Sequence, residues 1–171
     1  MKNTIYLLAF IATFIFSSCN RNPINKIFDT AKKEDNVVAV TLPGWMIKKG
    51  VSMAMKNDTV VNDVTTLNTI AGAIKKVRVL VKSHSSEAFT ADMNKQVDNL
   101  SSKNFDTYAF IKSDENKVTV YGKEDKDKLK DLFFYVNGDE NMAILHLKTD
   151  ISIADFQKLN LSFNKDKQKN N

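Results

Sequence analysis

The fold of this chain is decided by residues 105–147, FDTYAFIKSDENKVTVYGKEDKDKLKDLFFYVNGDENMAILHL. Asp114 to Asn116 are typical of the turn of a hairpin, and Asn137-Gly138 is typical of the type I′ turn of a second hairpin. Strands joined by such short turns are antiparallel neighbours, so the stretch predicts an antiparallel sheet. Its four predicted strands are short runs rich in apolar, β-branched and aromatic residues, at 105–111, 118–121, 132–136 and 142–147.

Helices and a further strand flank this stretch. Residues 76–82 (KVRVLVK) alternate, which predicts a half-buried strand with Val77, Val79 and Val81 on its inner face. Ser86 can cap a helix that runs to Leu100, with Phe89, Met93, Val97 and Leu100 as its apolar stripe. Ser152 and Asp155 form a capping box that opens a last helix carrying Ile153, Phe156 and Leu159. The predicted order of this half is β-α-β-β-β-β-α.

The first half of the mature chain is predicted to be mostly helical. An amphipathic helix at 24–35 precedes a strand at 37–41, which ends at Pro43-Gly44. Two helices follow, one at 45–56 and one at 62–74. The first of these is expected to turn Trp45, Met46, Val51 and Met55 inward. The whole pattern predicts an α+β fold in two layers, a mainly antiparallel sheet covered by amphipathic helices.

The N-terminus has the form of an export signal. Lys2 is followed by an apolar run from Ile5 to Phe16, which is too short to span a bilayer comfortably, and then by two serines and Cys19. That position resembles the bacterial lipobox, in which the cysteine is acylated and becomes the new N-terminus. Two other interpretations stay open: an ordinary signal peptide with a chance cysteine at the cut, and an uncleaved N-terminal anchor.

The chain then divides into a signal peptide at 1–18, a lipidated tether at 19–26, a single α+β domain at 27–163 and a disordered tail at 164–171. Cys19 is the only cysteine, so no disulfide within the chain is possible and the domain must rely on its core. The formal net charge of +5 comes almost entirely from lysine, because arginine occurs only at Arg21 and Arg78. Nucleic-acid recognition favours the guanidinium group, so we expect no nucleic-acid partner.

The residues described above resemble a family of bacterial lipoproteins of unknown function, domain of unknown function number 4252. The similarity covers most of residues 24–160, in the lipoprotein signal, KKVRVLVKS, SSKNFDTYAFIKSDENKVTVYGK and DLFFYVNGDENMAILHLKTDISIADFQKL. It implies a lipid-anchored envelope protein and brings no activity, cofactor or site residues. Asn20-Arg21-Asn22 follow the cysteine in place of acidic residues, which favours the periplasmic face of the outer membrane.

Candidate catalytic residues are few. His146 sits inside an apolar strand and His84 in the polar loop SHSSE, so we interpret the first as structural and the second as part of a helix-capping loop. Two separated histidines and a lipidated cysteine cannot form a zinc site, and the acidic turns lack calcium-loop spacing. No cofactor or metal site is therefore predicted.

Two classes of function remain open. The first is a non-enzymatic binding or adaptor module, held to the membrane by lipid on Cys19, that meets an envelope protein through its sheet or the Trp45 region. Trp45, Tyr108 and Tyr121 are the candidate ligand or partner surface, although core packing is the alternative role for such aromatics. The second is a small envelope hydrolase whose carboxylates are brought together by the fold. The lack of a catalytic motif favours the first.

Overall fold

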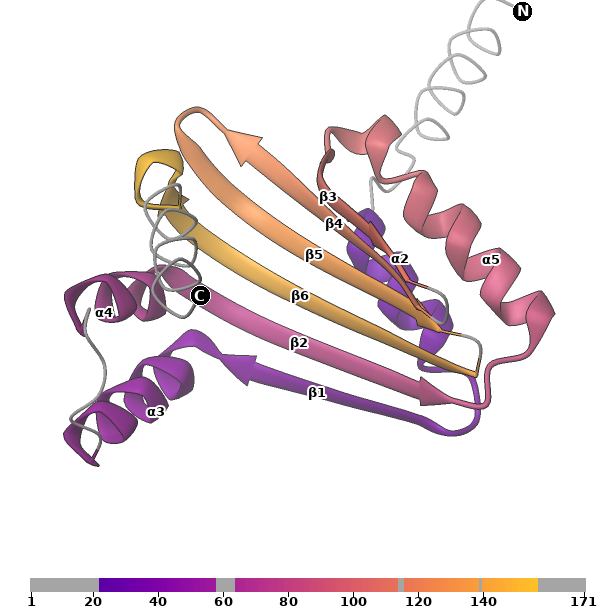
Figure 1. Cartoon of the computed structure of the whole chain (residues 1–171), viewed down its shortest axis with the longest axis horizontal. Coiled ribbons are helices and arrows are strands. Elements are labelled where there is room, and N and C mark those ends of the chain that lie inside the picture. The colour runs from indigo at the N-terminus through magenta and orange to yellow at the C-terminus, as the bar shows by residue number, and fades with distance from the viewer. Residues whose placement is uncertain (1–21, 58–63, 114–115, 139, 157–171) are drawn as a thin grey trace, which may run out of the picture.

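The computed structural model describes residues 22–57, 64–113, 116–138 and 140–156 (Figure 1). It has the predicted α+β architecture, with the strands in a single sheet. The elements in chain order are α2 (Pro23–Ala31), β1 (Val37–Pro43), α3 (Gly44–Asn57), α4 (Val64–Ala73), β2 (Ile74–Ser83), α5 (Glu87–Asp98), η1 (Ser101–Lys103), β3 (Asp106–Lys112), β4 (Asn116–Asp125), β5 (Lys128–Gly138) and β6 (Asn141–Ser152).

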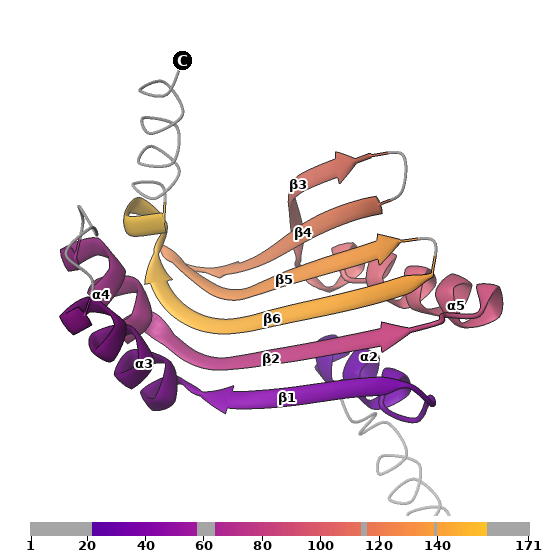
Figure 2. The same ribbon diagram turned by 60° about the horizontal axis from the view of Figure 1, so that its bottom comes forward.

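The sheet has the strand order β1-β2-β6-β5-β4-β3, and every neighbouring pair is antiparallel. Strands β3 to β6 form a meander, and β6 then pairs with β2, which carries β1 on its outer side. Helices α2 and α5 lie together on one face of the sheet, whereas α3 and α4 lie beside one end of the strands (Figures 1 and 2). The predicted two-layer α+β fold is confirmed.

Local capping explains where the two covering helices begin. The side chain of Asn22 accepts a hydrogen bond from the Ile24 amide at 3.0 Å, and Pro23 opens α2. In α5 the predicted cap is confirmed, because Ser86 Oγ accepts from the Phe89 amide at 3.3 Å. Both helices turn an apolar stripe to the sheet. These stripes are Ile24, Ile27, Phe28 and Ala31 in α2, and Phe89, Met93 and Val97 in α5.

The predicted capping box at the end of β6 is also confirmed. Ser152 Oγ accepts from the Asp155 amide at 3.1 Å and bonds the Asp155 carboxylate at 2.7 Å. Residues 153–156 are helical behind it. Leu159, predicted for the same helix, lies outside the described residues.

The predicted turn between β5 and β6 is wrong in position. Strand β5 continues through Gly138, Asn137 pairs with Met142, and no described glycine has a positive φ. The connection therefore lies after Gly138 rather than at Asn137-Gly138. Pairing in this register keeps Val136 opposite Ala143, and a shift of one residue would have turned each apolar side chain to the opposite face.

The hairpin between β4 and β5 was not predicted from the sequence. The charged residues 123–131 continue both strands, and Lys126 takes a positive φ of 57° in the tight turn. Charged side chains hid the strand pattern here, because β4 ends in exposed charged residues and β5 begins with charged residues interleaved with the buried Leu129.

The inward orientation predicted for the start of α3 is wrong. Trp45 is 62% exposed and Met46 is 42% exposed. The helix begins where β1 ends, beyond the region that α2 and α5 cover, and it packs mainly on α4 (Figure 2). Met55 was also predicted to face inward, and its side chain lies outside the described part of the structure.

The inner face predicted for β2 is reversed. Leu80 is fully buried and Lys82 is 5% exposed, whereas Val81 is 41% exposed. Lys82 tolerates burial because its ammonium group donates to the Asp35 carbonyl at 2.8 Å and lies over the Phe89 ring, 5.0 Å from the ring centroid. The valines of β2 therefore belong to the face that α2 and α5 do not cover.

Candidate functional site

The face of the sheet turned away from α2 and α5 is a grid of apolar side chains. Residues paired across antiparallel strands point to the same face, so the register defines rows that cross all six strands. Following the pairs from β1 to β3 gives three rows of six positions, which together we name the open face. Row one is Val38, Val81, Ala143, Val136, Val118 and Ile111; row two is Val40, Val79, Leu145, Phe134, Val120 and Ala109; row three is Leu42, Val77, Leu147, Leu132, Gly122 and Asp106.

The two faces of the sheet differ in chemistry. Of the eighteen positions of the open face, sixteen carry apolar side chains, one is glycine and one is Asp106 at the edge. The opposite face mixes core residues such as Leu80 and Phe133 with Arg78, Lys82 and His146. The face with the purer apolar character is therefore the one that α2 and α5 leave uncovered.

Exposure on the open face increases from row three to row one. Val77 and Leu132 in row three are 9% and 5% exposed, whereas Val40 in row two is 46% exposed. In row one, Val38 and Ile111 reach 66% and 60%. Scattered apolar side chains on a surface are ordinary, but a contiguous apolar patch marks an interaction site.

The row-three end of the open face is closed by other parts of the chain. The Tyr108 ring lies over Gly122 and meets Phe156 edge-on, with ring centroids 6.1 Å apart. Ile70 and Ala73 of α4 pack with Phe156 around the buried cluster that includes Leu132. Rows one and two therefore form the part of the open face that is available to a partner.

The structure does not bring the sequence-predicted surface residues together. Trp45 lies in the first turn of α3, just past the end of the edge strand β1, and Tyr108 lies on β3 at the opposite edge of the sheet. Tyr121 is 5% exposed and packs among the core residues beneath α5. Only Tyr108 borders the open face, where its hydroxyl bonds Glu124 and where burial, followed by that carboxylate, raises its pKa. Cys19 lies outside the described residues.

A buried polar cluster surrounds His146, beneath α2. His146 is 3% exposed, and its Nε2 lies 2.7 Å from Asp131 Oδ1. Arg78 donates from Nε to His146 Nδ1 at 3.1 Å and from Nη1 to Asn25 Oδ1 at 2.9 Å, while its guanidinium lies over the Phe28 ring. This arrangement fixes the neutral tautomer that donates from Nε2 to Asp131.

The chemistry of this cluster is structural. Burial lowers the pKa of His146, and although the hydrogen bond to Asp131 opposes this shift, the nearby Arg78 charge adds to it. The imidazole is enclosed between the sheet and α2, so a substrate has no direct access to it. Sequence reasoning missed Arg78 and Asp131, because they meet His146 only through the register of β2 and β5 with β6.

His84 lies apart from this cluster. It occupies the exposed loop between β2 and α5 with a positive φ of 55°. In the part of the chain that the structure describes, no three His, Cys, Asp or Glu side chains gather as a metal site. Within the same residues, no helix is long and apolar enough to cross a membrane.

Comparison with protein families gives one match. The model of the family "Domain of unknown function (DUF4252)" matches residues 28–159, which is most of the chain. No curated protein matches the sequence. The chain belongs to the DUF4252 family, and the resemblance seen in the sequence is confirmed at the level of the family.

Proposed function

We propose that this DUF4252 protein is a lipid-anchored protein of the cell envelope that acts by binding, with its open face as the binding surface. The occupant that fits this surface best is the open face of a second copy of the chain. Two lipid-anchored copies would then form a face-to-face sandwich of two sheets. The observation that carries the proposal is the uninterrupted apolar character of rows one and two across all six strands.

The anchor part of the proposal rests on the N-terminal sequence. The charged start, the short apolar run and the serines before Cys19 support it, because they match the pattern of a lipoprotein precursor. Asn20-Arg21-Asn22 behind the cysteine favour the periplasmic face of the outer membrane.

The size of the open rows supports a protein partner. With strands about 4.8 Å apart and paired positions about 6.7 Å apart along a strand, two rows across six strands cover roughly 400 Å². The largest contiguous apolar patch on a typical soluble monomer covers about 300–600 Å², and such a patch is often functional. At 25 cal/mol per Å², burying the patch would contribute on the order of 10 kcal/mol before the cost of association.

The uncharged character of rows one and two limits which partner can bind there. None of the twelve positions in rows one and two is ionisable, so a partner must offer an uncharged, gently twisted surface. A second copy offers such a surface with the same twist, and two sheets of like twist pack face to face about 10 Å apart. Residues 157–171 carry three large apolar side chains, Leu159, Leu161 and Phe163, against the twelve positions of rows one and two.

The test is the mass of the acylated, detergent-purified chain in solution. We expect the wild-type protein to be a dimer at micromolar concentration and Val40→Lys to be a monomer, because the charge falls inside row two. Ala39→Lys is the matched control: Ala39 is exposed on the same edge strand but points to the other face, so this variant should stay dimeric. Circular dichroism checks that both variants fold. A wild-type monomer, or equal dissociation by both variants, would overturn the proposed partner.

A further inference from the structure

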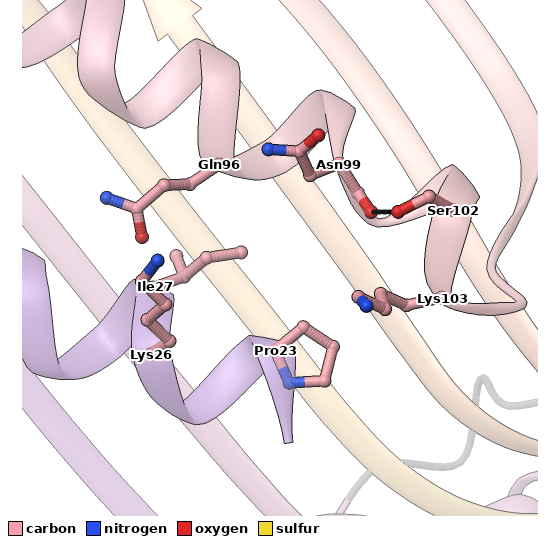
Figure 3. A pocket seen from close by; sticks show the side chains of 7 residues that line it. All are labelled: Pro23, Lys26, Ile27, Gln96, Asn99, Ser102 and Lys103. Carbon is pink, nitrogen blue, oxygen red and sulfur yellow. Dashed lines mark hydrogen bonds between the residues drawn. The ribbon is translucent and has the colours of Figure 1, made fainter. Parts of the chain in front are cut away.

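A cleft of about 330 Å³ lies between α2 and the segment that runs from α5 into η1 (Figure 3). Pro23, Lys26 and Ile27 line it from α2. Gln96, Asn99, Ser102 and Lys103 line it from the other side. Figure 3 shows that the Lys26 and Lys103 side chains reach into the gap from its two sides.

The lining of this cleft suits an anion. It holds two ammonium groups and no carboxylate, and the exposed Asn99 side chain also lines it. Ser102 already donates to the Asn99 carbonyl at 2.8 Å, whereas Gln96 uses one of its two amide hydrogens for Asp92 at 2.7 Å and keeps the other. The donors left for a ligand are Lys26, Lys103, the Asn99 amide and one Gln96 amide hydrogen, which match the several acceptor oxygens of a phosphate group.

The position of the cleft in the chain points to the source of the phosphate. Pro23 lies four residues after Cys19, a span of at most about 14 Å even for fully extended chain. If Cys19 carries lipid, as proposed above, its backbone sits at the bilayer surface and the mouth of the cleft lies within reach of the head groups. Arg21 adds another cation to the same stretch.

We infer that the cleft binds the phosphate of an anionic phospholipid head group, so that the domain is held in a defined orientation against the membrane. This inference rests on the proposed lipid anchor, because only the anchor brings the cleft to the bilayer. Each lysine near an anionic surface strengthens binding about fivefold, so the pair supplies a measurable preference for anionic over neutral lipid.

The test compares the full acylated chain in vesicles of neutral phosphatidylcholine and in vesicles containing phosphatidylglycerol. Modification of each lysine by an amine-reactive reagent is followed by mass spectrometry. We expect Lys26 and Lys103 to react more slowly in the anionic vesicles, because a bound phosphate engages both ammonium groups. Exposed Lys49 and Lys112, far from the cleft, should react at the same rate in both. Lys26→Gln should restore the reactivity of Lys103, and Lys112→Gln should not.

Three outcomes would overturn the inference. Equal modification rates of Lys26 and Lys103 in both vesicles would show that the cleft binds no anionic lipid. Slowing of all four lysines would show a diffuse effect of the charged surface. Equal protection by inorganic phosphate added to neutral vesicles would assign the cleft to free phosphate instead of lipid. Flotation with the neutral vesicles reports the anchor separately. A chain that fails to float contradicts the proposed function, and the cleft is then tested with soluble dihexanoyl phosphatidylglycerol.

Discussion

The Arg78 guanidinium donates from Nε to Nδ1 of His146 at 3.1 Å, and this contact makes the buried histidine a fixed acceptor. A proton on Nδ1 would point at the N–H groups of the Arg78 guanidinium, which would repel it. Burial lowers the pKa of His146 below its usual 6.5, and the Arg78 charge adds to this shift. Below pH 6.5 the unfolded chain therefore binds more protons at this site than the folded chain, so stability must fall as the pH drops through that value.

Thermal unfolding between pH 7.5 and 5 measures this effect. The melting temperature of the wild-type protein should decrease below pH 6.5. In His146→Leu the slope should flatten, and the variant should be less stable at neutral pH by about 2–3 kcal/mol because Arg78 and Asp131 lose their partner. His84→Asn is the control, since asparagine tolerates positive φ and the site is exposed. A His146→Leu protein with the wild-type slope would show that another group titrates.

Glycine at position 122 makes room for the Tyr108 ring. A Cβ atom there would lie 2.3 Å from Tyr108 Cε2, so Gly122→Ala must displace the ring from the open face. We expect a loss of about 1–3 kcal/mol, because overpacking forces a side chain out of its contact. In a Tyr108→Ala background the same change should cost much less. A double-mutant cycle measures the coupling, and additive effects would contradict this packing.

Gly44 and Gly50 provide a matched pair at the start and middle of α3. A Cβ at Gly44 would lie 2.1 Å from the Ile74 carbonyl oxygen, which is backbone and cannot swing aside. Gly44→Ala should therefore destabilise the domain, by about 2 kcal/mol or more. Gly50 has nothing within 4 Å of its Cβ position, so Gly50→Ala should stabilise by about 0.5–1 kcal/mol. Chemical denaturation distinguishes the two, and equal effects would contradict the junction between α3 and β2.

The lipid anchor is tested by Cys19→Ala. The variant should leave the membrane fraction or accumulate as the uncleaved precursor, because the acylated thiol is gone. The mass of the wild-type protein should exceed that of residues 19–171 by the mass of its acyl groups. A mature wild-type chain without acyl groups would exclude the anchor.

Much of the fold could be predicted from the sequence, because helix stripes and strand alternation are local. The α5 stripe of Phe89, Met93 and Val97 follows from helical spacing, and the Ser152–Asp155 box from its motif. Long-range register could not be predicted in the same way. The turn predicted at Asn137-Gly138 does not form there, because the apolar residues of the open face determine the register in which β5 pairs with β6.

The open face escaped prediction for a related reason. Alternation in β2 shows which side chains share a face, but it does not show which face the helices cover. Val77, Val79 and Val81 were assigned to the covered face because apolar residues are normally buried, whereas α2 and α5 cover the side that holds Leu80 and Lys82. The signal that could have revealed this is the purely apolar set that rows one and two form on one side of all six strands.

The measurement that tests the central claim most directly is photo-crosslinking at the open face in intact cells. A benzophenone side chain at Val81, 41% exposed in row one, should produce an adduct of twice the mass of the chain. The same group at Ala39, which points to the other face, should not. Adducts of Val81 with residues 157–171 of its own chain, with lipid, or with another protein would contradict self-association through the open face, as would an absence of any adduct.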